Sequence, residues 1–411
     1  MRRVRRHGYI GFFLILLSFG EKLPMVSKSQ EKIHPAYIFA GFSLLILVAY
    51  LDNARGPLLP VISKKLAIPY TYAGLFLTVG NLTAIASTML MVKAMKRFSE
   101  KVITLWICGF SGLIALLAPF ISDLAGLICL GAIIGVSIAT GGAMCNVLTI
   151  KGSPARVRGQ MLSGQQVMYG LGSFAAPFSL AAASFISWPW WSVLSSASIM
   201  LLILGIIYYL CLPNEIKTHA DIDKADRFRL KKIHIVALTS FGLYVAGEVM
   251  TSMWMATFLV DDIGLSSNEA APYVSGFFIT MAATRLAGFF FIRERVEKAV
   301  LFICLIVGIL ALIVSLLGFY YLLPTVGLVG PFFPLFTAEL SRTFPKAWQS
   351  MTVLVSVSMQ ISLSIMNLSV GVLTDALGIH KAFAVAPSLL LISLACLYWY
   401  ERLKKMGLAD A

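Results

Sequence analysis

The chain has 411 residues, of which 59% are apolar and 13% are charged, and its formal net charge is +14. An ordinary soluble domain is roughly 45–50% apolar and about 25% charged, so this composition excludes a soluble enzyme. The long apolar runs do not alternate with polar residues, which excludes a transmembrane β-barrel. In a membrane chain Lys and Arg first report which loops stay in the cytoplasm, so the positive charge indicates topology rather than nucleic-acid binding.

Apolar stretches long enough to cross a bilayer recur along the chain, since a helix needs about 20 residues to span it. The predicted spans centre on residues 35–56, 72–92, 102–121, 124–150, 161–187, 190–212, 233–260, 270–292, 299–317, 319–340, 350–374 and 382–400. These twelve windows predict an all-α membrane fold of twelve transmembrane helices.

The longest polar run between spans, residues 213–232, divides the chain after the sixth span. It predicts a cytoplasmic linker between an N-terminal six-helix bundle, 34–212, and a C-terminal six-helix bundle, 233–402. The sequence AGLFLT at 73–78 is echoed by SGFFIT at 275–280. An internal repeat of this kind indicates two pseudo-symmetric bundles, which is how many transporters are built.

Basic residues are concentrated in alternate loops, in the linker and in the C-terminal tail at 403–411. This asymmetry places both termini in the cytoplasm of a multi-pass protein, expected in the inner (plasma) membrane. Residues 1–33 combine a basic start with an apolar run too short to span. They are a cytoplasmic interfacial helix, an uncleaved signal-like segment or a leader created by a misplaced start upstream of Met25, and the last two interpretations are favoured.

Ionisable residues inside spans are costly, so each is a functional candidate. In the seventh span Glu248 lies about midway, with Tyr244 four residues before it, and a carboxyl group at that depth is a candidate proton carrier. In the first span Asp52 and Arg55 share one helix face, and they form either a substrate contact or a gate-closing ion pair. Arg285 in the eighth span needs a counter-charge, which Glu248 or a substrate oxygen could supply.

Uncharged polar residues at helical spacing indicate a polar cavity, although each could equally form an interhelical hydrogen bond. The candidate substrate-binding residues are Asn53, Asn146, Gln165, Gln166, Tyr169, Tyr244, Trp254, Gln360 and Asn367. Hydroxyl-rich solutes are bound by groups of this kind. Gly131 and Gly135 form a small-xxx-small pair that predicts close helix packing.

Motifs for other kinds of chemistry are absent from the sequence. There is no G-x-x-x-x-G-K-[ST], so ATP is not the energy source, and no H-E-x-x-H or G-x-S-x-G. The six cysteines lie in apolar runs without paired spacing, which indicates neither a metal site nor a disulfide framework. We therefore expect no catalytic residues, no metal and no cofactor.

Two six-helix halves, a polar linker and cytoplasmic termini resemble the major facilitator superfamily over about 34–402. Segments that resemble its fucose:proton symporter branch are Asp52-Asn53 with Gly56 and Pro60, Arg158-Gly159, Tyr244 with Glu248 and Trp254, Arg285 with Gly288, and Phe333-Pro334. That branch commonly carries an acidic residue where this chain has Gly142. The resemblance therefore implies that Glu248 and Asp52 carry the proton coupling here.

We expect a secondary-active transporter that moves a small polar solute by alternating access with proton symport, and a sugar is the favoured substrate class. A proton-coupled exporter of amphipathic compounds is the alternative, and a non-transporting membrane receptor is a third, less favoured hypothesis. The expected partners are the solute, the proton and the lipid bilayer, with no nucleic acid, and the protein is expected to be a monomer.

Overall fold

A computed structural model describes residues 33–154, 158–213, 230–292, 294–344 and 348–406. Nearly all of the leader predicted at 1–33, most of the linker at 213–232 and the last residues of the predicted tail lie outside the described residues. Within the described residues the chain is helical and contains no strand. This agrees with the all-α membrane fold expected from composition.

The first half of the structure consists of six spans. They are α2 (Pro35–Leu66), α3 (Tyr70–Ala94), α4 (Glu100–Leu117) with the short 3₁₀ helix η1 (Ala118–Phe120), α5 (Leu124–Gly152), α6 (Arg158–Phe185) and α7 (Trp191–Cys211). Side chains just before the first turn cap two of these helices. Ser99 caps α4, and Asp123 accepts a hydrogen bond from the Gly126 amide of α5 at 2.8 Å. At the end of α2, Ala67 takes a left-handed conformation, which stops the helix.

The second half contains the other six spans, two of which are interrupted. Its elements are α8 (Lys232–Asp261), α9 (Ser267–Phe291), α10 (Glu294–Leu316), η3 (Tyr320–Val329), α11 (Phe332–Thr343), α12 (Trp348–Leu377), α13 (Ile379–Phe383) and α14 (Val385–Lys405). The tenth span, expected as one helix over 319–340, is a 3₁₀ segment followed by a short α-helix. Pro324 and Pro331 supply no backbone N–H there, and Gly330 lies between the two pieces.

The count of spans agrees with the twelve predicted. Eleven helical segments are long and apolar enough to cross a membrane by length and composition. The helix that completes the set is α9, which is 25 residues long and carries Arg285 in its second half. Its polar residues include Arg285, which is half-buried, and the rest of the helix is mainly apolar.

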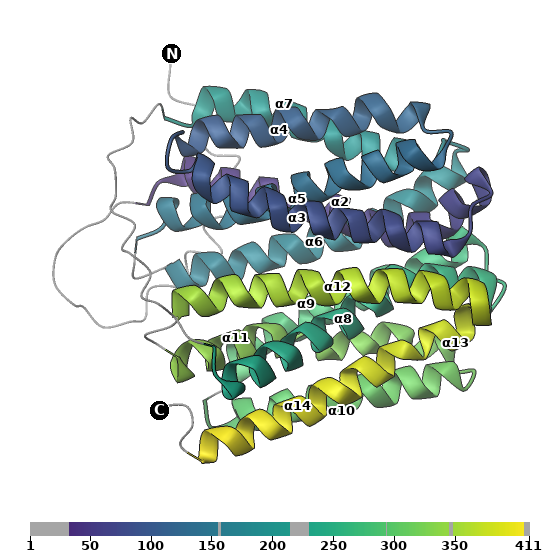
Figure 1. Cartoon of the computed structure of the whole chain (residues 1–411). Helices are drawn as coiled ribbons and strands as arrows, with labels where there is room; N and C mark the ends of the chain where they lie inside the picture. Colours follow the sequence, from purple (N-terminus) through teal and green to yellow (C-terminus); the bar gives the residue numbers. More distant parts are fainter. Residues whose placement is uncertain (1–32, 155–157, 214–229, 293, 345–347, 407–411) are drawn as a thin grey trace. The chain divides into compact units, whose positions relative to one another are not determined.

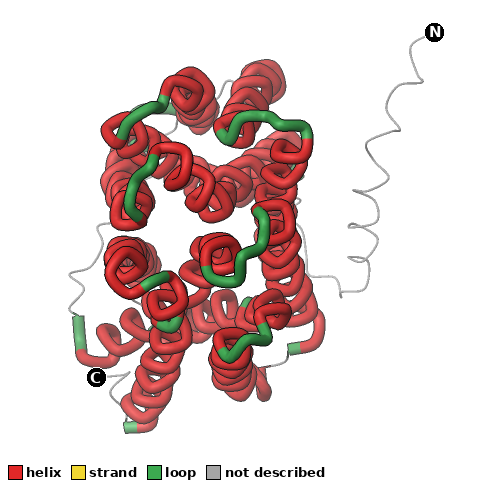
Figure 2. The backbone as a smooth tube through the Cα atoms, turned by 90° about the vertical axis from the view of Figure 1, so that its right-hand side faces the viewer, coloured by secondary structure: helices red, strands yellow, loops and turns green. Residues whose placement is uncertain are grey.

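The two halves lie side by side, as the upper and lower groups of helices in Figure 1. Within the first half α2 packs on α5 and α6, and within the second half α8 packs on α12 and α14. Between the halves α3 packs on α12, α6 on α9 and α2 on α8. We call the face where α2 begins and α14 ends the terminal face, and the other, seen end-on in Figure 2, the opposite face.

The halves approach most closely toward the opposite face. A Cβ atom at Gly56 of α2 would lie 2.6 Å from the Met253 Cα of α8. A Cβ atom at Gly74 of α3 would lie 2.4 Å from the Asn367 carbonyl oxygen of α12. Glycines therefore allow backbone-to-backbone contact between the halves in this part of the structure.

Candidate functional site

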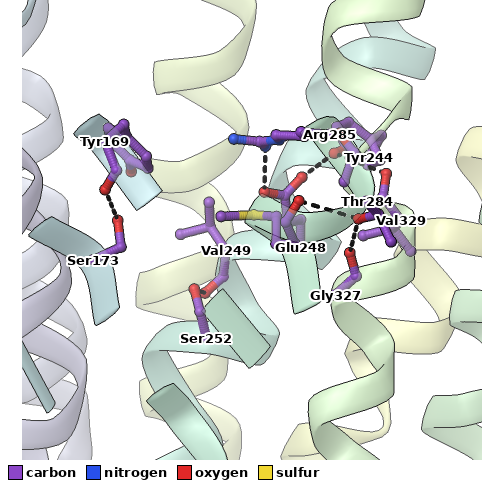
Figure 3. Close-up of polar contacts among 12 residues, drawn as sticks. Tyr169, Ser173, Tyr244, Glu248, Val249, Ser252, Thr284, Arg285, Gly327 and Val329 are labelled. Carbon is purple, nitrogen blue, oxygen red and sulfur yellow. Dashed lines mark hydrogen bonds and ion pairs between the residues drawn. The ribbon is translucent and has the colours of Figure 1, made fainter. Parts of the chain in front are cut away.

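A buried carboxylate on α8 is the centre of the candidate site. Glu248 is 8% exposed and lies near the middle of α8. Its Oε1 accepts a hydrogen bond from Arg285 Nη2 of α9 at 3.1 Å, and the hydroxyl of Tyr244 donates to Oε2 (Figure 3). The structure thus brings together three residues that the sequence had singled out, and it shows that Glu248 is the counter-charge of Arg285.

The interrupted tenth span provides further partners for this cluster. Arg285 Nε donates to the Gly330 carbonyl at 3.0 Å, and the Tyr244 hydroxyl lies 3.4 Å from the Val329 carbonyl. Thr284 Oγ1 lies 3.2 Å from the Gly327 carbonyl. Carbonyls at a helix break can lack their usual partners, and Arg285 supplies a donor to the Gly330 carbonyl, while the Gly327 carbonyl also accepts from the Gly330 amide. The carboxylate is therefore connected to the break in the tenth span through Tyr244 and Arg285.

Aromatic rings surround the ion pair and limit its hydration. The Tyr244 and Phe332 rings have centroids 4.2 Å apart, and the Arg285 guanidinium lies 5.8 Å from the Phe333 centroid. A charge pair in such surroundings is held mainly because each partner compensates the other, and removal of one typically costs about 3–5 kcal/mol.

The second cluster belongs to the first half. The Arg55 guanidinium pairs with the Asp52 carboxylate one turn before it on α2, and its Nε donates to the Asp52 carbonyl at 3.1 Å. Tyr169 of α6 lies 3.3 Å from Asp52 Oδ2. Asn53 Nδ2 donates to Ser173 Oγ at 2.8 Å and to the Tyr169 hydroxyl at 3.2 Å. Asn53 therefore positions the tyrosine beside the carboxylate.

The two clusters face each other across the contact between the halves. Figure 3 shows the Arg285 side chain extending from α9 over Glu248 toward the side where Tyr169 lies. Helix α6, which carries Tyr169, packs on α9, which carries Arg285, and α2 packs on α8. The candidate site thus contains one acid–guanidinium pair from each half, and Tyr169 contacts the pair of the first half.

The remaining sequence candidates lie in different surroundings. Trp254 is fully buried and its Nε1 donates to Asn367 Oδ1 at 3.2 Å, so these two residues bind each other between α8 and α12. Gln165 is also fully buried, and among the described residues neither polar atom of its amide has a hydrogen-bond partner, nor does Gln360 Oε1. The remaining candidates, Asn146 and Gln166, are exposed.

Sequence reasoning missed Thr284 and the carbonyls of Gly327, Val329 and Gly330. The available signal was the combination of Pro324, Gly327, Gly330 and Pro331 within one apolar window. Such a combination predicts an interrupted helix, and interrupted spans often lie at transporter binding sites. Within the described residues no group of three or more His, Cys, Asp or Glu could hold a metal ion.

The sequence matches the model of the Major Facilitator Superfamily over residues 41–329. The chain therefore belongs to this superfamily of membrane transporters, and that part of the resemblance seen in the sequence is confirmed. The fucose:proton symporter branch stays a hypothesis. No curated relative matches the sequence.

Solved structures with this fold include a bacterial homologue of the human lysosomal transporter Spinster. Its inward-facing, occupied structure matches with a TM-score of 0.65 and 14% identity, covering 90% of this chain and 97% of that one. Its inward-facing, unoccupied structure gives 0.66 and 13%, covering 91% and 98%. The human organic anion transporter MFSD10 gives 0.65 and 13%, covering 89% and 99%. At these identities the likeness shows the fold alone.

Proposed function

We propose that this protein is a proton-coupled symporter that carries a small polar solute, with a sugar as the expected class, by alternating access. The observation that carries the proposal is the buried Glu248, which pairs with Arg285 on two helices that pack against the first half. A carboxylate in this position is the group on the chain that can load a proton at the centre of the membrane. Asp52, in the facing cluster, is the second candidate for coupling.

Protonation of Glu248 would change the partners of Arg285. A neutral carboxyl group no longer balances the guanidinium, which still donates to the Gly330 carbonyl. The guanidinium then needs another acceptor, and oxygens of a polar solute between Arg285 and Tyr169 can supply one. Proton and solute therefore bind best together. A ligand shifts the two states only by its different affinity for them, so this joint binding would couple the proton to the solute.

A second candidate function is proton-coupled export of amphipathic compounds. Two aromatic rings, Phe332 and Phe333, lie beside the charged groups and could contact the apolar part of such a compound. The structural neighbours include a protein described as an organic anion transporter. An exporter would use the same carboxylate, releasing its proton as the substrate leaves.

Purified protein in proteoliposomes with an internal pH-sensitive dye distinguishes these functions. Hexoses, deoxyhexoses, organic acids and amphipathic drugs are added outside one at a time. Internal acidification on adding a sugar would establish symport and its substrate class. Proton movement with a drug alone would favour export, and no proton movement with any compound would contradict proton coupling.

Glu248→Gln tests the proton carrier itself, because the amide keeps the side-chain shape but does not ionise. We expect loss of accumulation driven by a pH gradient, while exchange of labelled for unlabelled solute continues. Glu269→Gln is the matched control, since Glu269 belongs to the capping box at the start of α9, roughly 24 Å along the helix from Arg285. Accumulation by Glu248→Gln equal to that of the parent protein would contradict the proposal.

A further inference from the structure

An acidic residue of the second half supplies the missing cap of a helix in the first half. Helix α3 begins after Pro69, which offers no side-chain hydrogen bond, and its first turn contains no acidic residue. The Asp375 carboxylate of α12 accepts instead from the Tyr70 amide at 2.8 Å and from the Thr71 amide at 2.6 Å. It also accepts from Thr71 Oγ1 at 2.6 Å. Both carboxylate oxygens are therefore directed at the first turn of α3.

Three other described spans, α4, α5 and α9, take a side-chain cap from the residue just before their first turn. Asp123 caps α5 from the residue just before it, and Ser266 caps α9 in the same way. The cap of α3 comes instead from Asp375, which lies 305 residues after Tyr70 in the chain. A capping carboxylate accepts hydrogen bonds from the free amides of the first turn and interacts favourably with the positive end of the helix dipole. This contact therefore stabilises the arrangement in which α3 and α12 are packed together at the opposite face.

Neighbouring contacts hold the same turn of α3 against the second half. The Tyr70 hydroxyl donates to Asp261 at the end of α8, and its ring lies edge-on to Trp254 with centroids 6.2 Å apart. A Cβ atom at Gly371 would lie 2.5 Å from the Tyr70 carbonyl oxygen. The start of α3 therefore contacts both α8 and α12 at the opposite face.

We propose that Asp375 and the first turn of α3 form a latch, the Asp375–α3 latch, which holds the opposite face closed and must release before that face opens. In the closed state the α3 amides bind a carboxylate, and after separation of the halves they bind water. The latch therefore biases the equilibrium between the closed and open states. It acts whatever the solute is and does not depend on the proton carrier, so its test can fail or succeed independently of the proposed function.

Distances between spin labels on the two halves test the latch. Lys65 of α2 and Lys381 of α13 are both exposed at the opposite face, and each is replaced by Cys and labelled. Cys129, Cys211 and Cys396 are first replaced by Ser to avoid background labelling. In this background Asp375→Ala should increase the ratio of the long-distance, open population to the closed one about five-fold, as expected from the loss of one cap.

Asp123→Ala is the matched control, because it removes a cap of the same kind that lies within the first half. It should leave the distance distribution unchanged. Asp375→Asn keeps one oxygen that can accept from an amide, so it should give an intermediate open population and serves if the alanine variant does not fold. A distribution in Asp375→Asn or Asp375→Ala identical to that of the parent would overturn the proposal, as would an equal shift in Asp123→Ala.

Discussion

At the scale of single residues, the pairing of Glu248 with Arg285 matters both for the stability of the folded protein and for the proposed proton coupling. The side chain of Glu248 is 11% exposed and that of Arg285 is 16% exposed, so water contributes little to either charge. Each charge is tolerated because the other compensates it. A transporter that protonates Glu248 must therefore supply a new partner for Arg285 in every cycle, which is the physical reason to expect the solute at this place.

Arg285→Gln tests this compensation. The substitution leaves Glu248 as an unpaired buried charge, so we expect it to lower the stability of the folded protein by about 3–5 kcal/mol. The double variant Glu248→Gln with Arg285→Gln removes both charges and should recover most of that loss. Thermal unfolding in detergent, followed by the loss of monodisperse protein, measures both. Equal stability of Arg285→Gln and the double variant would contradict the compensation.

The sequence predicted contacts within one helix better than contacts between helices that are distant in the chain. The contacts of Tyr244 with Glu248 and of Asp52 with Arg55 lie on single helices, where spacing alone brings the side chains together. The cost of a lone buried charge predicted a partner for Arg285, which was expected to be Glu248 or a substrate oxygen, and the structure shows that it is Glu248. The hydrogen bond of Trp254 to Asn367 joins α8 to α12, and no local pattern predicts which helices meet.

At the scale of elements, glycines determine how closely the helices pack. A Cβ atom at Gly135 of α5 would lie 2.0 Å from the Gly80 carbonyl oxygen of α3, and one at Gly131 would lie 2.6 Å from the Phe76 carbonyl oxygen. The close packing predicted from this small-xxx-small pair is therefore confirmed. The interruption of the tenth span was not predicted, because the apolar window of 319–340 was taken as continuous despite its prolines and glycines.

Gly135→Ala measures the importance of this close approach. The added methyl group meets backbone that cannot rotate away, so α3 and α5 must separate, and we expect a loss of about 1–3 kcal/mol of stability. Gly142→Ala is the matched control in the same helix, because a Cβ atom there would have no neighbour within 4 Å. It should be neutral or stabilise by up to about 1 kcal/mol through helix propensity. Melting temperatures in detergent compare the two, and equal values would contradict the prediction.

At the scale of the whole molecule, charge is distributed unequally between the two faces. The spans ending at the terminal face carry basic residues there, namely Lys93, Lys151, Arg342, Lys404 and Lys405. The opposite face holds Asp123, Asp261, Asp262, Glu269 and Asp375 beside Lys64, Lys65 and Lys381. The positive-inside rule therefore predicts that the terminal face is cytoplasmic. This predicted orientation rests on the basic residues that the fold places on one side of the molecule.

Reporter fusions test this orientation in cells. Green fluorescent protein attached after Ala411 should fluoresce, because it folds in the cytoplasm. Alkaline phosphatase inserted after Ser187, in the turn between α6 and α7 at the opposite face, should be active, because it needs an oxidising compartment. The control exchanges the two reporters: alkaline phosphatase after Ala411 should be inactive, and green fluorescent protein after Ser187 should not fluoresce. An active phosphatase at the C-terminus would contradict the predicted orientation.

Alternating access requires the two halves to move as units, and pairs of introduced cysteines can test this. Thr78 of α3 donates to the Ser364 carbonyl of α12 at 3.1 Å, so a short thiol cross-linker between Thr78→Cys and Ser364→Cys would join the halves. We expect it to stop solute flux in proteoliposomes, and cleavage of the linker to restore it.

The matched pair joins two helices of one half. Ser240 of α8 and Ser393 of α14 have hydroxyl oxygens 3.4 Å apart, within the second half. Cross-linked Ser240→Cys with Ser393→Cys should keep most of its flux, because helices of one half keep their positions when the halves rock. If both cross-links stopped flux equally, the motion would involve rearrangement within a half. If neither did, solute would cross without separation of α3 from α12, and rigid-body alternation between these halves would be wrong.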